Sequence, residues 1–115
     1  MKNKRIFISG GSGVIGKELI GKLLAQKAVI MTGDLVSLPN ELKKKVIFRK
    51  GDLNTIKKGY ISKFRPEIFI HLAAKFERVF ENKKHWQENF WNNVRLTHHL
   101  MTLMKDISSI KKIVN

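Results

Sequence analysis

The chain has 115 residues, of which 43% are hydrophobic and 28% are charged, a composition that excludes a disordered chain and favours one domain spanning residues 1–115. Its 23 Lys and Arg against 9 Asp and Glu give a formal net charge of +14 at pH 7, and such a field attracts anions. Cysteine is absent, which excludes disulfides, and no stretch approaches the roughly 18 apolar residues of a membrane span, so we expect a soluble protein of the cytoplasm.

The first elements in chain order are a strand, a helix and a second strand. Residues 5–8 form an apolar run that predicts a strand, and residues 28–32 form a second run of this kind, which Gly33 and Asp34 should end. Continuous apolar strands are typical of a parallel sheet that is buried on both faces. A helical pattern covers residues 17–26, and its apolar stripe consists of Ile15, Leu19, Leu23 and Leu24.

A glycine-rich loop joins the first strand to this helix and reads Ser9-Gly10-Gly11-Ser12-Gly13-Val14-Ile15-Gly16. Gly10 fits the tight turn that leaves the strand, Gly13 lets the backbone approach a pyrophosphate, and Gly16 lets the helix pack close to the sheet. The helix N-terminus adds unpaired N–H groups and a partial positive charge. Strand, loop and helix in this order predict a cradle for the phosphates of a dinucleotide.

The middle of the chain predicts two further strands. Residues 35–45 are short for a full crossover helix, so we expect a loop or a single turn before a third strand at 46–49. A helix is expected over residues 55–64, and Pro66 blocks its continuation before a fourth strand at 68–72.

The last part of the chain predicts a long amphipathic helix from His85 onward and the opening of a fifth strand at 111–115. Strands that alternate with helices imply right-handed crossovers, a parallel sheet with helices on both faces, and a ligand at the carboxyl ends of the strands. We expect Trp86, Phe90 and Trp91 to belong to a core or an interface. The apolar face of the helix carries Trp86, Phe90, Val94, Thr97, Met101 and Met104 at steps of three and four.

With these landmarks the whole chain resembles the extended short-chain dehydrogenase/reductase family, which includes the NAD-dependent sugar epimerases and dehydratases. The resemblance implies an α/β fold, namely a Rossmann-like doubly wound parallel sheet that would here be truncated at the fifth strand, with NAD as cofactor. It rests on an ordered set of motifs: residues 9–16, Asp34, Gly51-Asp52-Leu53, His71-Leu72-Ala73-Ala74, and Asn93 within Asn92-Asn93-Val94.

The resemblance implies where each part of the cofactor would bind. Asp34 lies 24 positions after Gly10, where the family places an acid that binds both hydroxyls of the adenosine ribose and repels a 2′-phosphate. This favours NAD, and nearby lysines keep NADP open as the less favoured cofactor. The diphosphate would be held by Gly10, Gly11, Ser12, Gly13, Val14, Ile15 and Gly16.

The remaining implied cofactor residues lie further along the chain. Asp52 would accept a hydrogen bond from the adenine amine, and Leu53 would cover one face of the ring. The segment Leu72-Ala73-Ala74 lacks bulk, so that the dinucleotide can lie across the sheet. Lys75 would reach a ribose hydroxyl or a phosphate, or else remain a solvated lysine. Asn93 matches an asparagine that orients the segment beside the nicotinamide.

The chain also departs from the family pattern. Ser9 stands where threonine is more usual, and Leu96 stands where relatives commonly have a glycine. Hydride transfer in the family depends on a Ser or Thr and on a Tyr-x-x-x-Lys pair, in which the lysine lowers the pKa of the tyrosine. The only tyrosine here, Tyr60, has Lys63 three positions on and Phe64 at the fourth. We therefore expect no catalytic residue in this chain and no catalysis by it alone.

Three functions stay open at this point. The leading one is the cofactor-binding part of an epimerase/dehydratase-like enzyme that acts on a nucleotide sugar or a similar substrate. The second is a non-catalytic dinucleotide-binding or sensing module that works through a partner, and an uncovered fifth strand would also favour self-association. A basic nucleic-acid-binding domain is less favoured, because no basic stripe with interleaved aromatic residues is present. Metal binding is not expected from the spacing of His71, His85, His98 and His99.

Overall fold

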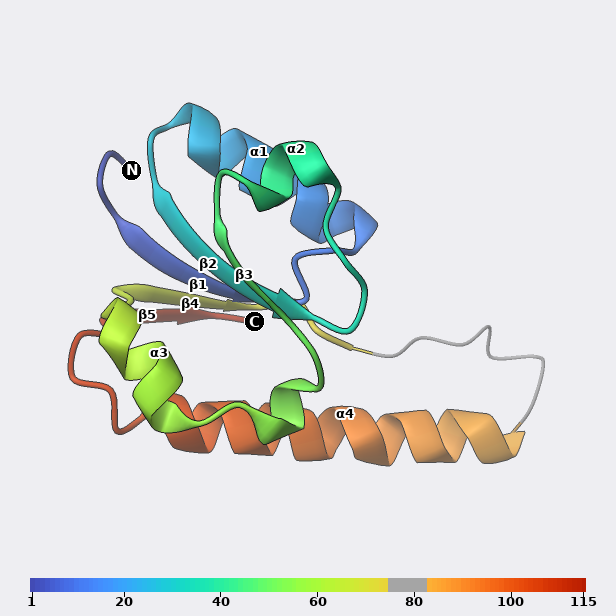
Figure 1. The fold of residues 1–115 in the computed structure, drawn as a ribbon. Helices are drawn as coiled ribbons and strands as arrows, with labels where there is room; N and C mark the ends of the chain where they lie inside the picture. Colours follow the sequence, from blue (N-terminus) through green and yellow to red (C-terminus); the bar gives the residue numbers. More distant parts are fainter. Residues whose placement is uncertain (75–82) are drawn as a thin grey trace.

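A five-stranded parallel sheet forms the centre of the fold in the computed structural model, which describes residues 1–74 and 83–115 (Figure 1). The strands are β1 (Arg5–Ser9), β2 (Val29–Asp34), β3 (Ile47–Lys50), β4 (Ile68–His71) and β5 (Lys112–Val114). They lie in the order β3-β2-β1-β4-β5, and every neighbouring pair is parallel. This order confirms the predicted doubly wound α/β fold. From β1 the chain first adds strands on one side, β2 and β3, and then crosses to add β4 and β5 on the other side. The strand order therefore reverses between β1 and β4, and ligands bind at such a reversal in open α/β sheets.

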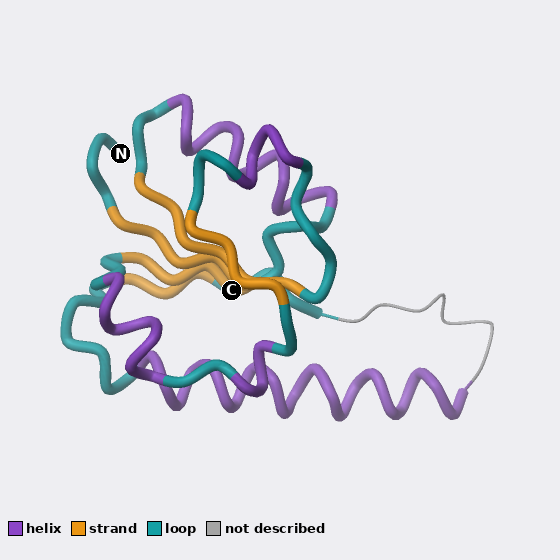
Figure 2. Tube along the Cα trace, in the orientation of Figure 1, coloured by secondary structure: helices purple, strands orange, loops and turns teal. Residues whose placement is uncertain are grey.

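Helices cover both faces of the sheet. Figures 1 and 2 show α1 and α2 on one face and α3 and α4 on the other. In the described part of the chain, no helix has the length and apolar character that crossing a membrane requires. The helical elements are α1 (Val14–Ala25), α2 (Asn40–Lys43), the short 3₁₀ helix η1 (Leu53–Thr55), α3 (Lys58–Phe64) and α4 (Lys83–Met104).

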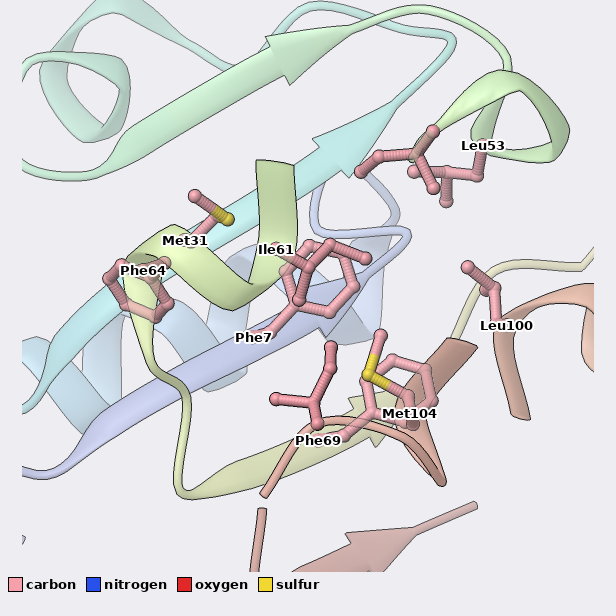
Figure 3. Close-up of a cluster of buried hydrophobic side chains, with 10 residues drawn as sticks. Phe7, Met31, Leu53, Ile61, Phe64, Phe69, Leu100 and Met104 are labelled. Atoms are coloured by element: carbon pink, nitrogen blue, oxygen red, sulfur yellow. The ribbon is translucent and has the colours of Figure 1, made fainter. Parts of the chain in front are cut away.

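The side chains of β1 alternate between two apolar cores, because successive residues of a strand point to opposite faces. Ile6 and Ile8 pack in the core that α1 contributes to with Ile20. Phe7 belongs to the opposite core, beneath α3 and α4, where its ring stacks on Phe69 with the centroids 5.5 Å apart (Figure 3). Both cores are therefore centred on β1, which explains why its apolar residues are fully buried.

Two predicted boundaries are wrong for local reasons. The strand predicted to end before Gly33 continues through Asp34, because Gly33 is in register with both β1 and β3. The helix predicted over 55–64 is split into η1 and α3. Asp52 caps η1 through a hydrogen bond from the Asn54 amide, and the chain is extended at Ile56, so α3 starts only at Lys58.

The buried face of each long helix also differs from the prediction. In α1 the buried positions are Gly16, Ile20 and Leu23, whereas Ile15 is 71% exposed. The cause is the close packing of Gly16, which turns its neighbour Ile15 outward.

In α4 the exposed residues include Phe90, Trp91 and Val94. Phe90 and Trp91 are therefore not part of the core, and their place in an interface stays a prediction. Figure 1 shows that the N-terminal half of α4 extends past the sheet, and the helix is anchored by Leu100 and Met104 near its other end. The side chain of Trp86 lies outside the described part of the structure.

Candidate functional site

A cavity of about 560 Å³ opens at the carboxyl ends of the strands, beside α4. This volume is within the range of small-molecule and cofactor sites, roughly 300–1,000 Å³. The structure brings most of the residues named for the cofactor to its walls, namely Gly10, Ser12, Gly13, Asp34, Asp52, Leu53, Leu72, Ala73, Ala74 and Asn93. Residues that the sequence did not single out for binding also line it, namely Leu35, Val36, Gly51, Asn54, Asn92, Arg95 and Leu96.

Gly10 makes the turn that leaves β1, as predicted. Its φ is +80°, a left-handed conformation that favours glycine. A Cβ at this position would lie 2.7 Å from the backbone of Ala73, which also excludes any larger residue. The Gly10 amide donates to the carbonyl of Gly33 at 2.8 Å. The loop is thereby held between the ends of β2 and β4.

Gly11 and Gly16 serve packing, and neither lines the cavity. A Cβ at Gly11 would overlap Oγ1 of Thr32, so the loop lies directly on β2. A Cβ at Gly16 would lie 2.6 Å from the carbonyl oxygen of Gly10. Gly16 was expected to bring the helix close to the sheet, and the contact that it permits is instead with the backbone of the loop.

Gly13 has a different environment, because the nearest atom to a Cβ there would be the Gly10 oxygen at 3.9 Å. It is the N-cap residue of α1, lines the cavity and has no side chain to cap the first N–H groups of the helix. Val14 and Ile15 follow and are exposed outside the cavity wall.

Asp34 stands at the end of β2, half-buried, and is oriented by two backbone amides. The amide of Ser12 donates to Oδ2 at 3.0 Å and the amide of Val36 donates to Oδ1 at 3.3 Å. The hydroxyl of Ser12 donates to the carbonyl of Val36 at 2.6 Å. These bonds connect the glycine loop with the segment after β2 and hold the carboxylate at the cavity wall.

The segment after β3 forms the neighbouring wall. Oδ1 of Asp52 accepts from the amide of Asn54 at 2.9 Å and from its side chain at 3.1 Å. Leu53 is buried, and its Cδ2 would lie 2.7 Å from a Cβ at Gly33, so the glycine makes room for it. The side chain of Arg49 donates to the hydroxyl of Thr55 at 3.2 Å, which ties this segment back to β3.

A buried chain of polar side chains lies below the cavity and was missed by the sequence analysis. Ser9 Oγ lies 2.5 Å from Nδ1 of His71, and Nε2 of His71 lies 2.9 Å from Oγ1 of Thr97. Burial lowers the pKa of His71 below its ordinary value. Ser9 and His71 are the last residues of β1 and β4, and they meet because these two strands pair in register, which the sequence by itself does not show.

Residues 6–115 match the family described as the NAD dependent epimerase/dehydratase family. The chain belongs to this family. It is similar to CDP-glucose 4,6-dehydratase of Salmonella typhimurium, with 29% identity over an alignment of 127 residues. The alignment covers 99% of this chain and 34% of the relative.

Among solved structures, the fold is similar to UDP-glucose-4-epimerase of Stenotrophomonas maltophila, with a TM-score of 0.81 and 18% identity over 96% of this chain and 36% of that one. It is also similar to the UDP-Glc/GlcNAc 4-epimerase of Campylobacter jejuni, with a TM-score of 0.81 and 24% identity over 97% of this chain and 36% of that one. This epimerase/dehydratase chain therefore spans about a third of the length of the relatives that it matches.

The remaining predicted positions can now be placed in this epimerase/dehydratase fold. Asn93 is half-buried on α4 and lines the cavity, whereas Lys75 lies outside the described residues. Leu96, which replaces the more usual glycine, lines the cavity and packs against the core beneath α3 and α4. Tyr60 lies on α3, away from the cavity wall, with the guanidinium of Arg49 5.9 Å from its ring centroid.

Proposed function

We propose that the chain binds NAD as the cofactor-binding part of an epimerase/dehydratase that acts on a nucleotide sugar or a similar substrate. The observation that carries this proposal is the half-buried carboxylate of Asp34, which the Ser12 amide holds at the wall of a cavity that also includes the N-terminus of α1. An acid at this point and a helix N-terminus beside it match the ribose and the diphosphate of a dinucleotide.

The residues present fit NAD, which when bound supplies a nicotinamide ring that takes up and returns a hydride. The open space at Gly13 and the first N–H groups of α1 would receive the diphosphate. Oδ2 of Asp52 would accept from the adenine amine, since Oδ1 already accepts from Asn54. The low bulk of the segment 72–74 leaves room for the dinucleotide across the ends of the strands.

A negative charge at Asp34 favours NAD over NADP, because a 2′-phosphate would approach the carboxylate. The next two residues, Leu35 and Val36, line the same part of the cavity and carry no positive charge to offset that repulsion. Arg95 also lines the cavity, on the α4 side. We therefore propose NAD as the cofactor, with NADP bound more weakly.

The class of substrate is proposed from the relatives, whose names specify CDP-glucose and UDP sugars. The chain covers about a third of those proteins, and its sequence contains no Tyr-x-x-x-Lys motif. The proposal therefore assigns cofactor binding to this chain and assigns hydride transfer to none of its residues.

Isothermal titration calorimetry of the purified chain with NAD and with NADP tests the proposal. We expect NAD to bind more tightly than NADP, and both to compete for one site. Binding of neither dinucleotide would contradict it. Because the chain has a net charge of +14, a duplex DNA titrated at low salt is the control for non-specific binding of an anion. Binding of DNA without binding of either dinucleotide would favour the nucleic-acid hypothesis instead.

We also propose that the chain associates with a second copy or a partner chain along β5. This strand is at the edge of the sheet, and its residues Ile113 and Val114 are 44% and 40% exposed. Exposed apolar edge strands offer unpaired backbone groups to another strand. A location in the cytoplasm stays a prediction.

A further inference from the structure

Three polar side chains form a continuous hydrogen-bonded chain through the interior, from β1 through β4 to α4. Ser9 Oγ lies 2.5 Å from Nδ1 of His71, and Nε2 of His71 lies 2.9 Å from Oγ1 of Thr97. His71 is only 6% exposed, and its ring stacks on that of Phe69 with the centroids 5.9 Å apart. A buried imidazole with partners on both nitrogens has a defined protonation state.

The hydrogen-bond donors around Ser9 indicate which nitrogen of the His71 ring carries the proton. The amide of Ala73 donates to Ser9 Oγ at 3.3 Å, and the amide of Leu72 is shared between the Ser9 carbonyl at 2.9 Å and Ser9 Oγ at 3.1 Å. Both contacts use Oγ as an acceptor. The tautomer that fits these contacts has the Ser9 hydroxyl donating to Nδ1 of His71 and the ring proton on Nε2, where it is donated to Thr97. A second ring proton on Nδ1 would face the Ser9 hydroxyl and displace one of the two amides.

Those two amides belong to the wall of the cavity. Leu72 and Ala73 both line it, and the backbone of Ala73 lies against Gly10 of the glycine-rich loop. On the other side of the imidazole, Thr97 lies one turn beyond Asn93, which lines the cavity from α4. His71 is therefore connected through Ser9 to the wall after β4 and through Thr97 to α4.

We propose that His71 is a positioning residue for the dinucleotide, which in its neutral form holds the wall after β4 and α4 at the spacing that the ligand requires. The proposal rests on the NAD binding proposed above. It adds a consequence that the cofactor residues themselves do not predict, namely that affinity falls when His71 takes up a proton.

The neighbouring titratable groups do not supply an alternative partner for the imidazole. Arg5, at the opposite end of β1, donates to the carbonyl of Phe64 at 2.5 Å. On α4, His99 bonds to the carbonyl of Ile56 at 3.2 Å. The other titratable side chains described on α4 are exposed, namely Glu88, Arg95 and His98. Burial accordingly accounts for the lowered pKa of His71.

The test is calorimetric titration of the whole chain with NAD at about pH 7.5 and about pH 5. For the unmodified chain we expect affinity to be weaker at the lower pH, because protonation of His71 disfavours the arrangement that binds NAD. His71→Gln does not titrate, so its affinity is expected to be weaker than that of the unmodified chain at the higher pH and nearly equal at the two pH values. His98→Gln, on the exposed side of α4, is the matched control and should keep the full pH dependence.

Thr97 provides a second test that keeps the imidazole. Thr97→Val removes the acceptor for Nε2 and should weaken NAD binding about three- to tenfold at about pH 7.5, whereas Thr97→Ser keeps the hydroxyl and should restore it. The control is Thr102→Val, because the Thr102 hydroxyl bonds only within α4, to the carbonyl of His98 at 2.7 Å. Thermal unfolding of each variant shows whether it is folded.

The outcomes separate this inference from the proposed function. If the unmodified chain binds NAD and His71→Gln shows the same pH dependence, the positioning role is wrong and the cofactor proposal stands. Equal affinities for Thr97→Val and Thr97→Ser would also overturn the role. If the unmodified chain binds no NAD at either pH, the proposed function fails, and the inference fails with it.

Discussion

The backbone amide of Ser12 donates a hydrogen bond to Oδ2 of Asp34 at 3.0 Å, and this bond joins the glycine-rich loop to the end of β2. The residues are 22 positions apart in the sequence. The bond leaves the carboxylate with free acceptor positions, because each oxygen accepts one amide and has room for another donor. The side chain of Asp34 thus organises the loop and keeps acceptor positions for the ribose that we propose it binds.

Asp34→Ala should weaken NAD binding about 10- to 100-fold. The variant loses two hydrogen bonds from ribose hydroxyls to a charged acceptor, each with a contribution of roughly 1.5–3 kcal/mol before partial compensation by water. Calorimetry measures the change. Glu18→Ala is the matched control, because Glu18 is an exposed acid that pairs with Lys22 on α1. Undiminished affinity in Asp34→Ala would refute the assigned role.

Gly13→Val and Gly11→Ala should separate binding from folding. The φ of Gly13 is −73°, which other residues adopt, and apart from the adjacent residues the nearest atom to a Cβ there would be the Gly10 oxygen at 3.9 Å. Gly13→Val should therefore fold normally and lose NAD affinity, because its side chain occupies the space proposed for the diphosphate. Gly11→Ala would overlap Thr32 and lie 2.9 Å from Cδ1 of Ile20, so it should lower the unfolding temperature.

Comparison of the thermal unfolding and the NAD affinity of these two variants checks both statements. A Gly13→Val protein with normal affinity would remove the loop from the proposed site.

His71 should make the stability depend on pH in the acidic range. Burial lowers the pKa of the folded state below the value of 6.5 expected for an unfolded histidine. The unfolded chain therefore binds a proton first as the pH falls. The free energy of unfolding contributed by neutral His71 is present above about pH 6.5 and is lost as the pH falls through the lower pKa of the folded state.

Urea unfolding at a series of pH values measures this loss. His71→Gln should lack the corresponding part of the pH dependence, although its stability at neutral pH is lower. Parallel pH profiles for the two proteins would contradict the assignment to His71.

Phe69→Ala should destabilise the chain by about 3–5 kcal/mol, because it removes a fully buried ring from the core between β1, β4 and α4. The same substitution at Phe90, whose side chain is about half exposed on α4, should cost much less. Denaturant unfolding of the two variants tests this difference. A similar loss in both would mean that α4 packs differently from the arrangement in Figure 1.

Val114→Lys should reduce self-association along β5. Lysine on an exposed edge strand disfavours pairing with another strand, and Val114 is 40% exposed, so the fold should tolerate the change. Sedimentation velocity over a range of concentrations measures the association state. A monomer at all concentrations for the unmodified chain would contradict the proposed edge contact.

Much of the fold follows from the sequence by itself. Apolar runs such as 5–8 and 68–72 specify strands that are buried on both faces, and their alternation with helical patterns specifies a parallel sheet. The φ of Gly10 and the location of Asp34 were predictable because a turn between a strand and a helix, and an acid after the second strand, are local patterns.

The tertiary structure decided which residues face the core, which face the cavity and which face solvent. Trp91 has the apolar character of a core residue, yet it is 62% exposed because its half of α4 extends past the sheet. Ser9, His71 and Thr97 have no local pattern that joins them, because their hydrogen bonds span 62 and 26 positions of the chain. Such contacts depend on the pairing of β1 with β4 and on the docking of α4, which only the packed chain establishes.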